Sequence, residues 1–253
     1  MNNIAIQVNQ LTKKYRLGEI HEDSFKKLLG HWLGLSPAPK SISKDFYALN
    51  NISFQVKRGE VLGIVGHNGA GKSTLLKVLA RITDPTSGHA HIYGRVGTLL
   101  EIGTGFHPDL NGIENIFLNG AILGMHHYEI RQQLDEIIAF SGIEKFIYTP
   151  VKHYSSGMMM RLAFSVAAHL QADIIFLDEV WGTGDQEFSR KSMAKMKSIV
   201  NSGRTVMVIS HNLDIMQELC TRCLWMEQGK IILDGLPQSV IDSYQRSLLP
   251  ESA

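Results

Sequence analysis

The sequence predicts an α/β fold whose core is a mainly parallel β-sheet. Three short apolar runs, at residues 61–65, 174–177 and 206–209, have the length of strands. Their apolar residues follow one another without alternation, which is typical of strands buried on both faces beneath covering helices. The segment between the first two runs spaces its apolar residues three or four positions apart, as amphipathic helices do.

The composition favours one globular domain over residues 1–253. The chain has 44% hydrophobic residues, with 25 Lys and Arg against 24 Asp and Glu. This balance lacks the basic face that nucleic-acid binding requires, so we expect no nucleic-acid partner. No run approaches the ~18–20 apolar residues that span a bilayer, and the first residues lack the pattern of a secretory signal. We therefore expect a globular protein of the cytoplasm.

The remaining elements follow in chain order. A helical subdomain is expected at 105–170, because three stretches in it carry helical spacing, namely 112–123, 130–138 and 162–170. Residues 224–232 have the pattern of a strand, a glycine turn and a second strand. Residues 236–253 predict a short C-terminal helix and tail, with no room for a separate domain.

Each of the three apolar runs is followed at once by glycine or polar residues. Gly66 follows the first run, Asp178 and Glu179 end the second, and Ser210 and His211 follow the third. Ligands of open α/β sheets bind beyond the carboxyl ends of the strands. We therefore expect these residues to face one crevice.

Residues 66–73 match the phosphate-binding pattern G-x-x-x-x-G-K-[ST], the P-loop. The positions are Gly66, His67, Asn68, Gly69, Ala70, Gly71, Lys72 and Ser73. The glycines let successive N–H groups point inward, and the helix that begins near Lys72 turns its partly positive N-terminus toward the same anion. We expect Lys72 to contact the β- and γ-phosphates, Ser73 to bind Mg²⁺ and Thr74 to contact the α-phosphate. The sequence thus predicts nucleotide binding.

Asp178 and Glu179 are candidates for metal binding and catalysis. An aspartate at a strand tip can hold Mg²⁺ where the ion bridges the β- and γ-oxygens. Glu179 would then polarise the attacking water as general base. Taken alone, the pair fits a capped strand end equally well, but a P-loop upstream in the same chain favours the chemical roles. We expect His211 to hydrogen-bond the γ-phosphate.

A further motif carries a family resemblance. Residues 154–158, with the sequence YSSGM, begin a helix about twenty residues before Asp178. Together with the P-loop, the Asp-Glu pair and His211, they resemble the ATP-binding cassette (ABC) ATPases over nearly the whole chain. The resemblance implies a P-loop NTPase fold of ABC type, with an N-terminal β subdomain beside the mainly parallel sheet.

The family pattern assigns roles to these motifs. It implies that 66–74 is the Walker A loop, 174–179 the Walker B strand and His211 the switch histidine, with the D-loop ending at residues 184–185. It also implies that two copies of the chain pair head to tail. The signature residues of one copy would then contact the nucleotide in the P-loop of the other, and these residues are Ser155, Ser156 and Gly157.

Two positions depart from the usual family pattern. The usual signature is Leu-Ser-Gly-Gly-Gln, whereas Ser156 replaces its first glycine and Met158 its glutamine. The usual Q-loop glutamine is replaced by Glu101, a carboxylate that would help to ligate the metal or its waters. Both departures resemble the ATPase subunits of polysaccharide exporters. The O-antigen (lipopolysaccharide) type is the main expectation, with teichoic-acid and capsule exporters as alternatives.

Residues 17–45 form an insertion among the N-terminal strands. It contains one apolar stripe at helical spacing, consisting of Phe25, Leu28, Leu29, Trp32 and Leu33. An isolated helix of ~11 residues is marginal in water, so the stripe must pack on another surface. That surface is either the chain's own domain or a membrane subunit or bilayer interface, which Trp32 and the adjacent Lys26 and Lys27 would suit.

Two tyrosines flank this insertion. Tyr15 occupies the place where ABC ATPases carry an aromatic residue that stacks on adenine. Tyr47, where the chain re-enters the sheet, is the second candidate. Either ring could instead be a core aromatic.

The resemblance implies an ATPase that uses ATP and Mg²⁺ to power export of a lipid-linked polysaccharide. Its implied partners are a second copy of the chain, an integral-membrane subunit and, indirectly, the polysaccharide, all at the cytoplasmic face of the cytoplasmic membrane. A soluble ABC protein of DNA repair or translation is a rival, but no coiled-coil insertion, zinc module or second cassette is visible. A GTPase would need an Asn-Lys-x-Asp run, and the sequence has none.

Overall fold

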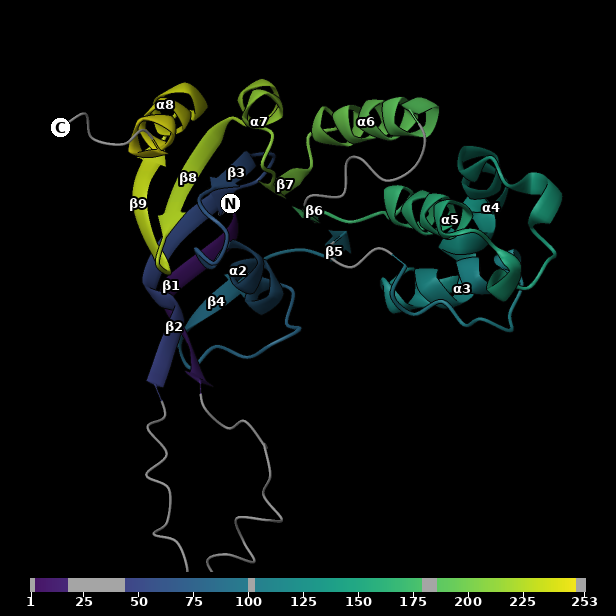
Figure 1. The fold of residues 1–253 in the computed structure, drawn as a ribbon, viewed down its shortest axis with the longest axis horizontal. Helices are drawn as coiled ribbons and strands as arrows, with labels where there is room; N and C mark the ends of the chain where they lie inside the picture. The colour runs from purple at the N-terminus through teal and green to yellow at the C-terminus, as the bar shows by residue number, and fades with distance from the viewer. Residues whose placement is uncertain (1–2, 18–43, 100–102, 179–185, 249–253) are drawn as a thin grey trace, which may run out of the picture.

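The computed structural model describes residues 3–17, 44–99, 103–178 and 186–248, which form an α/β fold around two β-sheets (Figure 1). The larger sheet has six strands in the order β5-β6-β7-β3-β8-β9. These are β3 (Val61–Val65), β5 (Val96–Leu99), β6 (Ile174–Asp178), β7 (Thr205–Ile209), β8 (Arg222–Glu227) and β9 (Lys230–Gly235). Neighbours from β5 to β8 are parallel and β9 is antiparallel to β8, so the prediction of a mainly parallel sheet is confirmed.

The central strands send alternate side chains into two separate cores. In β3, Val61 and Val65 enter one core, while Leu62 and Ile64 enter the other. Strands β6 and β7 divide their side chains in the same way. Because both faces of each strand are buried, the sequence of each strand is continuously apolar instead of alternating.

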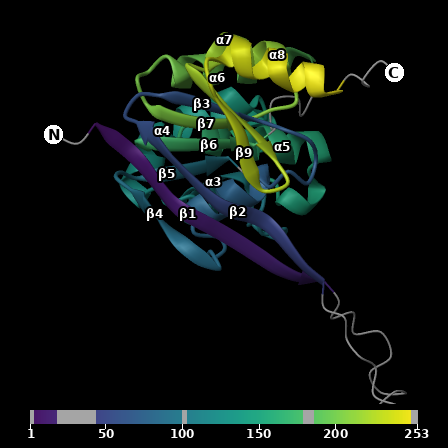
Figure 2. The same cartoon turned by 90° about the vertical axis from the view of Figure 1, so that its left-hand side faces the viewer.

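Different elements cover the two faces of this sheet, and Figure 2 shows them on opposite sides. One face carries the helices α6 (Gln186–Val200), α7 (Leu213–Leu219) and α8 (Pro237–Leu248). The other packs against the helix α2 (Lys72–Leu79) and a three-stranded antiparallel sheet of order β2-β1-β4. The strands of the smaller sheet are β1 (Ile4–Leu17), β2 (Lys44–Lys57) and β4 (Ser87–Ile92).

Three further helices lie beyond the β5 edge in Figure 1 and form a helical layer. They are α3 (Gly112–Ile122), α4 (His127–Ser141) and α5 (Ser156–Ala168), with 3-10 turns at Glu144–Phe146 and Val151–His153. Arg95, just before β5, ties α4 to the sheet through two hydrogen bonds to Glu129, at 2.7 and 2.8 Å. No helix in the described ranges is long and apolar enough to cross a membrane.

Strands β1 and β2 form a long antiparallel arm. The sequence places the end of the first strand near Tyr15 and the start of the next near Tyr47, whereas the paired strands extend to Leu17 and from Lys44. Residues 18–43 are outside the described residues, so the predicted amphipathic helix around Trp32 stays a prediction.

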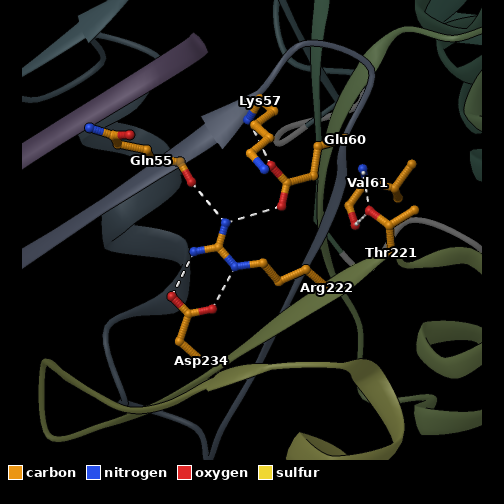
Figure 3. Close-up of polar contacts among 7 residues, drawn as sticks. All are labelled: Gln55, Lys57, Glu60, Val61, Thr221, Arg222 and Asp234. Atoms are coloured by element: carbon orange, nitrogen blue, oxygen red, sulfur yellow. Dashed lines mark hydrogen bonds and ion pairs between the residues drawn. The ribbon is translucent and has the colours of Figure 1, made fainter. Parts of the chain in front are cut away.

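The predicted hairpin at 224–232 is confirmed as β8 and β9. Its turn residues Gln228 and Gly229 have φ of 46° and 75°, the left-handed conformation of tight hairpin turns. Figure 3 shows how Arg222 fixes the hairpin to the rest of the sheet. Its guanidinium donates to Asp234 at 2.5 and 2.6 Å and to Glu60 at 3.1 Å. These two carboxylates raise the pKa of Arg222. The shared hydrogen bonds hold β9 beside the turn between β2 and β3.

Candidate active site

The carboxyl ends of β3, β6 and β7 open onto a cavity of about 390 Å³. It is lined by Phe46, Ala48, Asn68, Gly69, Gly71, Lys72, Ser73, Thr74, Asp178 and His211. Because β6, β7 and β3 are neighbours in the sheet, Asp178 and His211 lie beside the P-loop although they are far from it in sequence. The structure therefore brings together residues that the sequence predicts to share one crevice.

The path of the P-loop depends on two glycines. Gly66 has φ of 148°, and a Cβ atom there would lie 2.1 Å from the carbonyl oxygen of Met226. Gly71 has φ of 104°, and its Cβ would lie 2.2 Å from the carbonyl oxygen of Ala48. Both conformations are ones that L side chains rarely adopt. The loop can pass this close to β8 and β2 only because these positions lack a side chain.

Lys72 is the first residue of α2 and is 6% exposed. Its Nζ donates to the carbonyl oxygen of Gly66 at 2.6 Å and to that of His67 at 2.9 Å. The ammonium thus lies over the loop, close to the N-terminus of α2. A helix N-terminus and a cation together attract a phosphate group.

Ser73 and Asp178 both line the cavity and carry side-chain oxygens. Ser73 comes from the first turn of α2, and Asp178 is the last residue of β6. Hydroxyl and carboxylate oxygens are the ligands that Mg²⁺ prefers. Within the described residues no cluster of three or more His, Cys, Asp or Glu side chains occurs. Mg²⁺ held by one or two protein oxygens usually keeps waters and substrate phosphate oxygens as further ligands.

His211 reaches the cavity from the loop after β7. The adjacent Ser210 accepts a hydrogen bond from the Asn212 N–H at 3.1 Å, and the side chain of Asn212 caps α7 by accepting from the Ile215 N–H at 3.1 Å. This local network fixes the backbone on both sides of His211. The exposed imidazole lines the cavity together with Asp178.

The aromatic ring that lines the cavity belongs to Phe46, a residue that the sequence analysis missed. Tyr15 pairs with Phe46 across the strands, one strand further from the cavity. Tyr47 points to the opposite face of β2, where Lys14 Nζ lies 5.7 Å from its ring centroid. All three rings are 40–45% exposed, so none is a core aromatic. The period-two alternation of a strand groups Phe46 with Ala48, and this signal could have identified it.

The predicted signature residues lie apart from this cavity, at the start of α5. Ser155 is the N-cap of the helix, and its Oγ accepts from the Met158 N–H at 3.2 Å. Ser155 and Ser156 are exposed, and a Cβ atom on Gly157 would meet only the Ser155 side chain, at 3.8 Å. The start of α5 is therefore a solvent-exposed helix N-terminus, a place where anions can bind.

Three predicted sites fall outside the described residues. They are Glu101, in the metal set, Glu179, the proposed base, and the D-loop end at 184–185.

A protein-family model described as ABC transporter matches residues 49–181, more than half of the chain. The matched span begins in β2 and includes the P-loop, α5 and Asp178. The chain belongs to the ABC transporter family. Membership implies that this ABC transporter chain binds ATP, for which the P-loop cavity is the candidate site.

Curated relatives within the ABC transporter family point to exporters. An O-antigen export system ATP-binding protein of Klebsiella pneumoniae is 36% identical over 244 residues, 96% of this chain and 98% of that protein. One from Myxococcus xanthus is 42% identical over 249 residues, 96% of this chain and 56% of that protein. A teichoic acids export ATP-binding protein of Bacillus anthracis is 40% identical, over 97% of this chain and 43% of that protein. The chain spans about half the length of the latter two.

Solved structures of ABC cassettes share the fold. A dimeric ATP-binding cassette in a post-hydrolysis state with ADP and Pi has a TM-score of 0.69 at 22% identity, covering 92% of this chain and 98% of that one. An ATP-binding subunit of an ABC transporter has a TM-score of 0.70 at 19% identity, covering 98% and 95%. The prediction of an ABC-type P-loop fold is thereby confirmed.

Proposed function

We propose that this chain is the ATP-hydrolysing subunit of a transporter that exports a lipid-linked polysaccharide of O-antigen type. The observation that carries the proposal is that Lys72, Ser73, Asp178 and His211 line the same cavity. The Klebsiella pneumoniae relative, which the chain matches along nearly its full length, is named for O-antigen export. The subunit would work at the cytoplasmic face of the cytoplasmic membrane, attached to an integral-membrane subunit.

Nucleotide binding would use groups already gathered around the cavity. On nucleotide binding, Lys72 would exchange its hydrogen bonds to the carbonyl oxygens of Gly66 and His67 for contacts with the β- and γ-phosphates. Thr74 would contact the α-phosphate. Adenine would lie against the ring of Phe46, which we favour over Tyr15 and Tyr47 because Phe46 lines the cavity. Stacking on a ring at the mouth of the site would orient the base without burying it.

Magnesium would be held by the Ser73 hydroxyl and by the Asp178 carboxylate, directly or through water. When bound, the ion neutralises charge on the β- and γ-phosphate oxygens. Glu101, on the segment after β5, would add a second carboxylate to the ion or its waters.

Hydrolysis would require little covalent chemistry from the protein. Glu179 would take a proton from a water that attacks the γ-phosphorus in line with the leaving oxygen, releasing ADP and phosphate. The imidazole of His211 would donate a hydrogen bond to the γ-phosphate. Rate enhancement then comes from positioning and from stabilisation of the developing charge.

A second copy of the chain would complete the site. The N-terminus of α5, with Ser155, Ser156 and Gly157, is open to solvent and lies outside the P-loop cavity of its own chain. In a head-to-tail pair, this anion-binding terminus would cover the γ-phosphate in the partner's P-loop. Two nucleotides would then be enclosed at one interface.

The membrane subunit would dock in a groove beside β5. This groove has a volume of about 420 Å³, lies between the end of α2, β5 and the helices α3 and α5, and carries Ile82 and Ile122. These two side chains are 54% and 58% exposed. Because the walls come from both the sheet and the helical layer, a segment seated there would respond to movement between them. The insertion at 17–45 is the second proposed contact with the membrane subunit.

Teichoic-acid export is the second candidate, favoured by the 40% identity to the Bacillus anthracis protein. Capsule export is a third possibility within the same class. The three share the ATPase chemistry and differ in the polymer, which the membrane subunit would recognise.

A complementation experiment tests the export role. Deleting the gene should remove the polysaccharide from the cell surface and trap lipid-linked polymer inside. Lys72→Ala should fail to restore export, because losing a charged hydrogen bond to phosphate weakens nucleotide binding about tenfold or more. Lys77→Ala, on the same helix, is the matched control and should restore it. Wild-type surface polysaccharide without the chain would refute the proposal, and the composition of the trapped polymer identifies the cargo.

A further inference from the structure

The C-terminal helix reaches the P-loop through an aromatic contact. Tyr244 of α8 packs edge-to-face with His67, with ring centroids 5.6 Å apart and an interplanar angle of 73°. Tyr244 also lies against Trp225 of β8, with centroids 6.0 Å apart. Aromatic rings at these separations attract one another beyond the effect of burial. The backbone of His67 therefore belongs to the P-loop, while its ring packs against Tyr244 of α8.

Helix α8 is a firm support for this ring. Val240 and Ile241 are 0% and 2% exposed and pack in the core above the sheet, and Tyr244, one turn later, is 8% exposed. Gln238 joins the helix to Gln217 of α7 by a hydrogen bond. Burial raises the pKa of the Tyr244 hydroxyl, so the ring stays neutral at physiological pH. The packing of the whole helix thus fixes the ring that meets His67.

The backbone of His67 in turn holds the P-loop lysine. Its carbonyl oxygen accepts from Lys72 Nζ at 2.9 Å and from the Ala70 N–H at 3.1 Å. The ring and the carbonyl group of His67 are attached to the same Cα atom. Anchoring the ring therefore restricts the backbone conformations available to the loop and to the acceptor of Lys72.

We propose that Tyr244 is a positioning residue for the nucleotide site. By holding the ring of His67, it keeps the P-loop in the curled conformation that presents Lys72 and the backbone N–H groups to phosphate. The position of α8 is then coupled to nucleotide affinity. This inference rests on the proposed nucleotide site and goes beyond it, because it assigns a role to a helix that does not line the cavity.

A double-mutant cycle on ADP affinity, measured by calorimetry with the full chain, tests the proposal. Tyr244→Leu removes the aromatic contact but keeps most of the volume, and should raise the Kd for ADP about two- to tenfold, the range for one aromatic pair. His67→Ala should have a similar effect. If Tyr244 acts through His67, Tyr244→Leu should change the Kd by less than about twofold in the His67→Ala background. Tyr244→Phe keeps the ring and should retain the wild-type Kd.

Controls separate positioning from simple destabilisation. Ile199→Ala, at a buried site of α6 away from His67, should lower the melting temperature and leave the Kd unchanged. Equal effects of Tyr244→Leu in both backgrounds, or no effect in either, would overturn the inference. Failure of the proposed function would look different: the wild-type chain would then bind no ADP, or Lys72→Ala would bind it as tightly as the wild type.

Discussion

The cavity at the carboxyl edge of the sheet and the N-terminus of α5 both contain a helix N-terminus, but only the cavity combines it with a buried cation and side chains from several elements. In the cavity, a buried Lys72 lies among groups from the strands β2 and β6, the helix α2 and the loops after β3 and β7. At α5, Ser155 and Ser156 face solvent, and Gly157 leaves open space. Helix termini attract anions in both places, yet the residues at the α5 terminus do not line the P-loop cavity of their own chain.

This difference indicates a division of labour. In our proposal, the P-loop cavity holds the groups that binding and chemistry require, whereas α5 would cap the nucleotide of a second copy and not its own. In our account, each chain binds one nucleotide and closes the site of a second copy. Substitutions in the two regions should therefore have different signatures, one on affinity and one on turnover.

The largest effect is expected at the proposed catalytic base. Glu179→Gln should lower the ATP turnover rate by about 10²–10⁴-fold, because general-base catalysis supplies a factor of that size. ATP affinity should stay close to the wild-type value, since the amide keeps the shape of the side chain. Steady-state phosphate release with a parallel binding titration measures both quantities. The exposed Glu187→Gln on α6 is the control, and wild-type turnover in Glu179→Gln would remove its role as base.

The next effect concerns the cap on α5. Gly157→Asp should lower turnover about 100-fold, because a carboxylate at this terminus would repel the partner's γ-phosphate where a preorganised donor is needed. The fold should tolerate the change, since an acidic residue in the first turn favours a helix. ADP affinity should change by less than about twofold. Gln132→Glu, exposed on α4 in the same layer, adds the same single negative charge and is the control. A large loss of ADP affinity in Gly157→Asp would erase the distinction between the two regions.

A smaller effect is expected at Phe46, which lines the cavity. Phe46→Ala should weaken ATP binding about tenfold, as expected when a base loses an aromatic stacking partner. Tyr47→Ala, on the adjacent residue but the opposite face of β2, should weaken it by less than about twofold. Calorimetric titration of ATP into the two variants measures both affinities. A larger loss in Tyr47→Ala than in Phe46→Ala would assign adenine stacking to Tyr47.

The position of the P-loop cavity could be predicted from the sequence because its signals are local. Continuous apolar runs identify buried parallel strands, and the polar residues that end them identify the edge where the cavity lies. Phe46 was missed because the family pattern directs attention to Tyr15 and Tyr47, while the face that each ring occupies depends on the register between β1 and β2. The contact of Tyr244 with His67 carries no sequence signal, since it depends on how α8 packs over the sheet.

The smallest effect concerns the ion pair between Arg95, just before β5, and Glu129 of α4. The guanidinium of Arg95 holds the pKa of Glu129 at about 2, against an ordinary value of 4.5. The Glu129 carboxylate therefore binds a proton less readily in the folded state than in the unfolded chain. The ion pair makes its full contribution to the free energy of unfolding above pH 4.5, and this contribution is lost as the pH falls toward 2. Glu129→Gln should lower the melting temperature by about 2–4 °C at pH 7, the shift for about 1 kcal/mol in a domain of this size. The difference should shrink below pH 4.5 in thermal scans. A constant difference from pH 7 to pH 3 would contradict the assigned role of the pair.

The most direct test of the central claim is the mass of the Glu179→Gln variant by analytical ultracentrifugation with saturating ATP and Mg²⁺. Because the variant retains nucleotide without consuming it, our account predicts a species of twice the chain mass with ATP. It predicts a single-chain mass with ADP, and with ATP when Gly157→Asp is added. The shared site would be contradicted if the variant kept a single-chain mass under saturating ATP in a sample where ATP binding is verified. The same result would have to hold with the membrane subunit present.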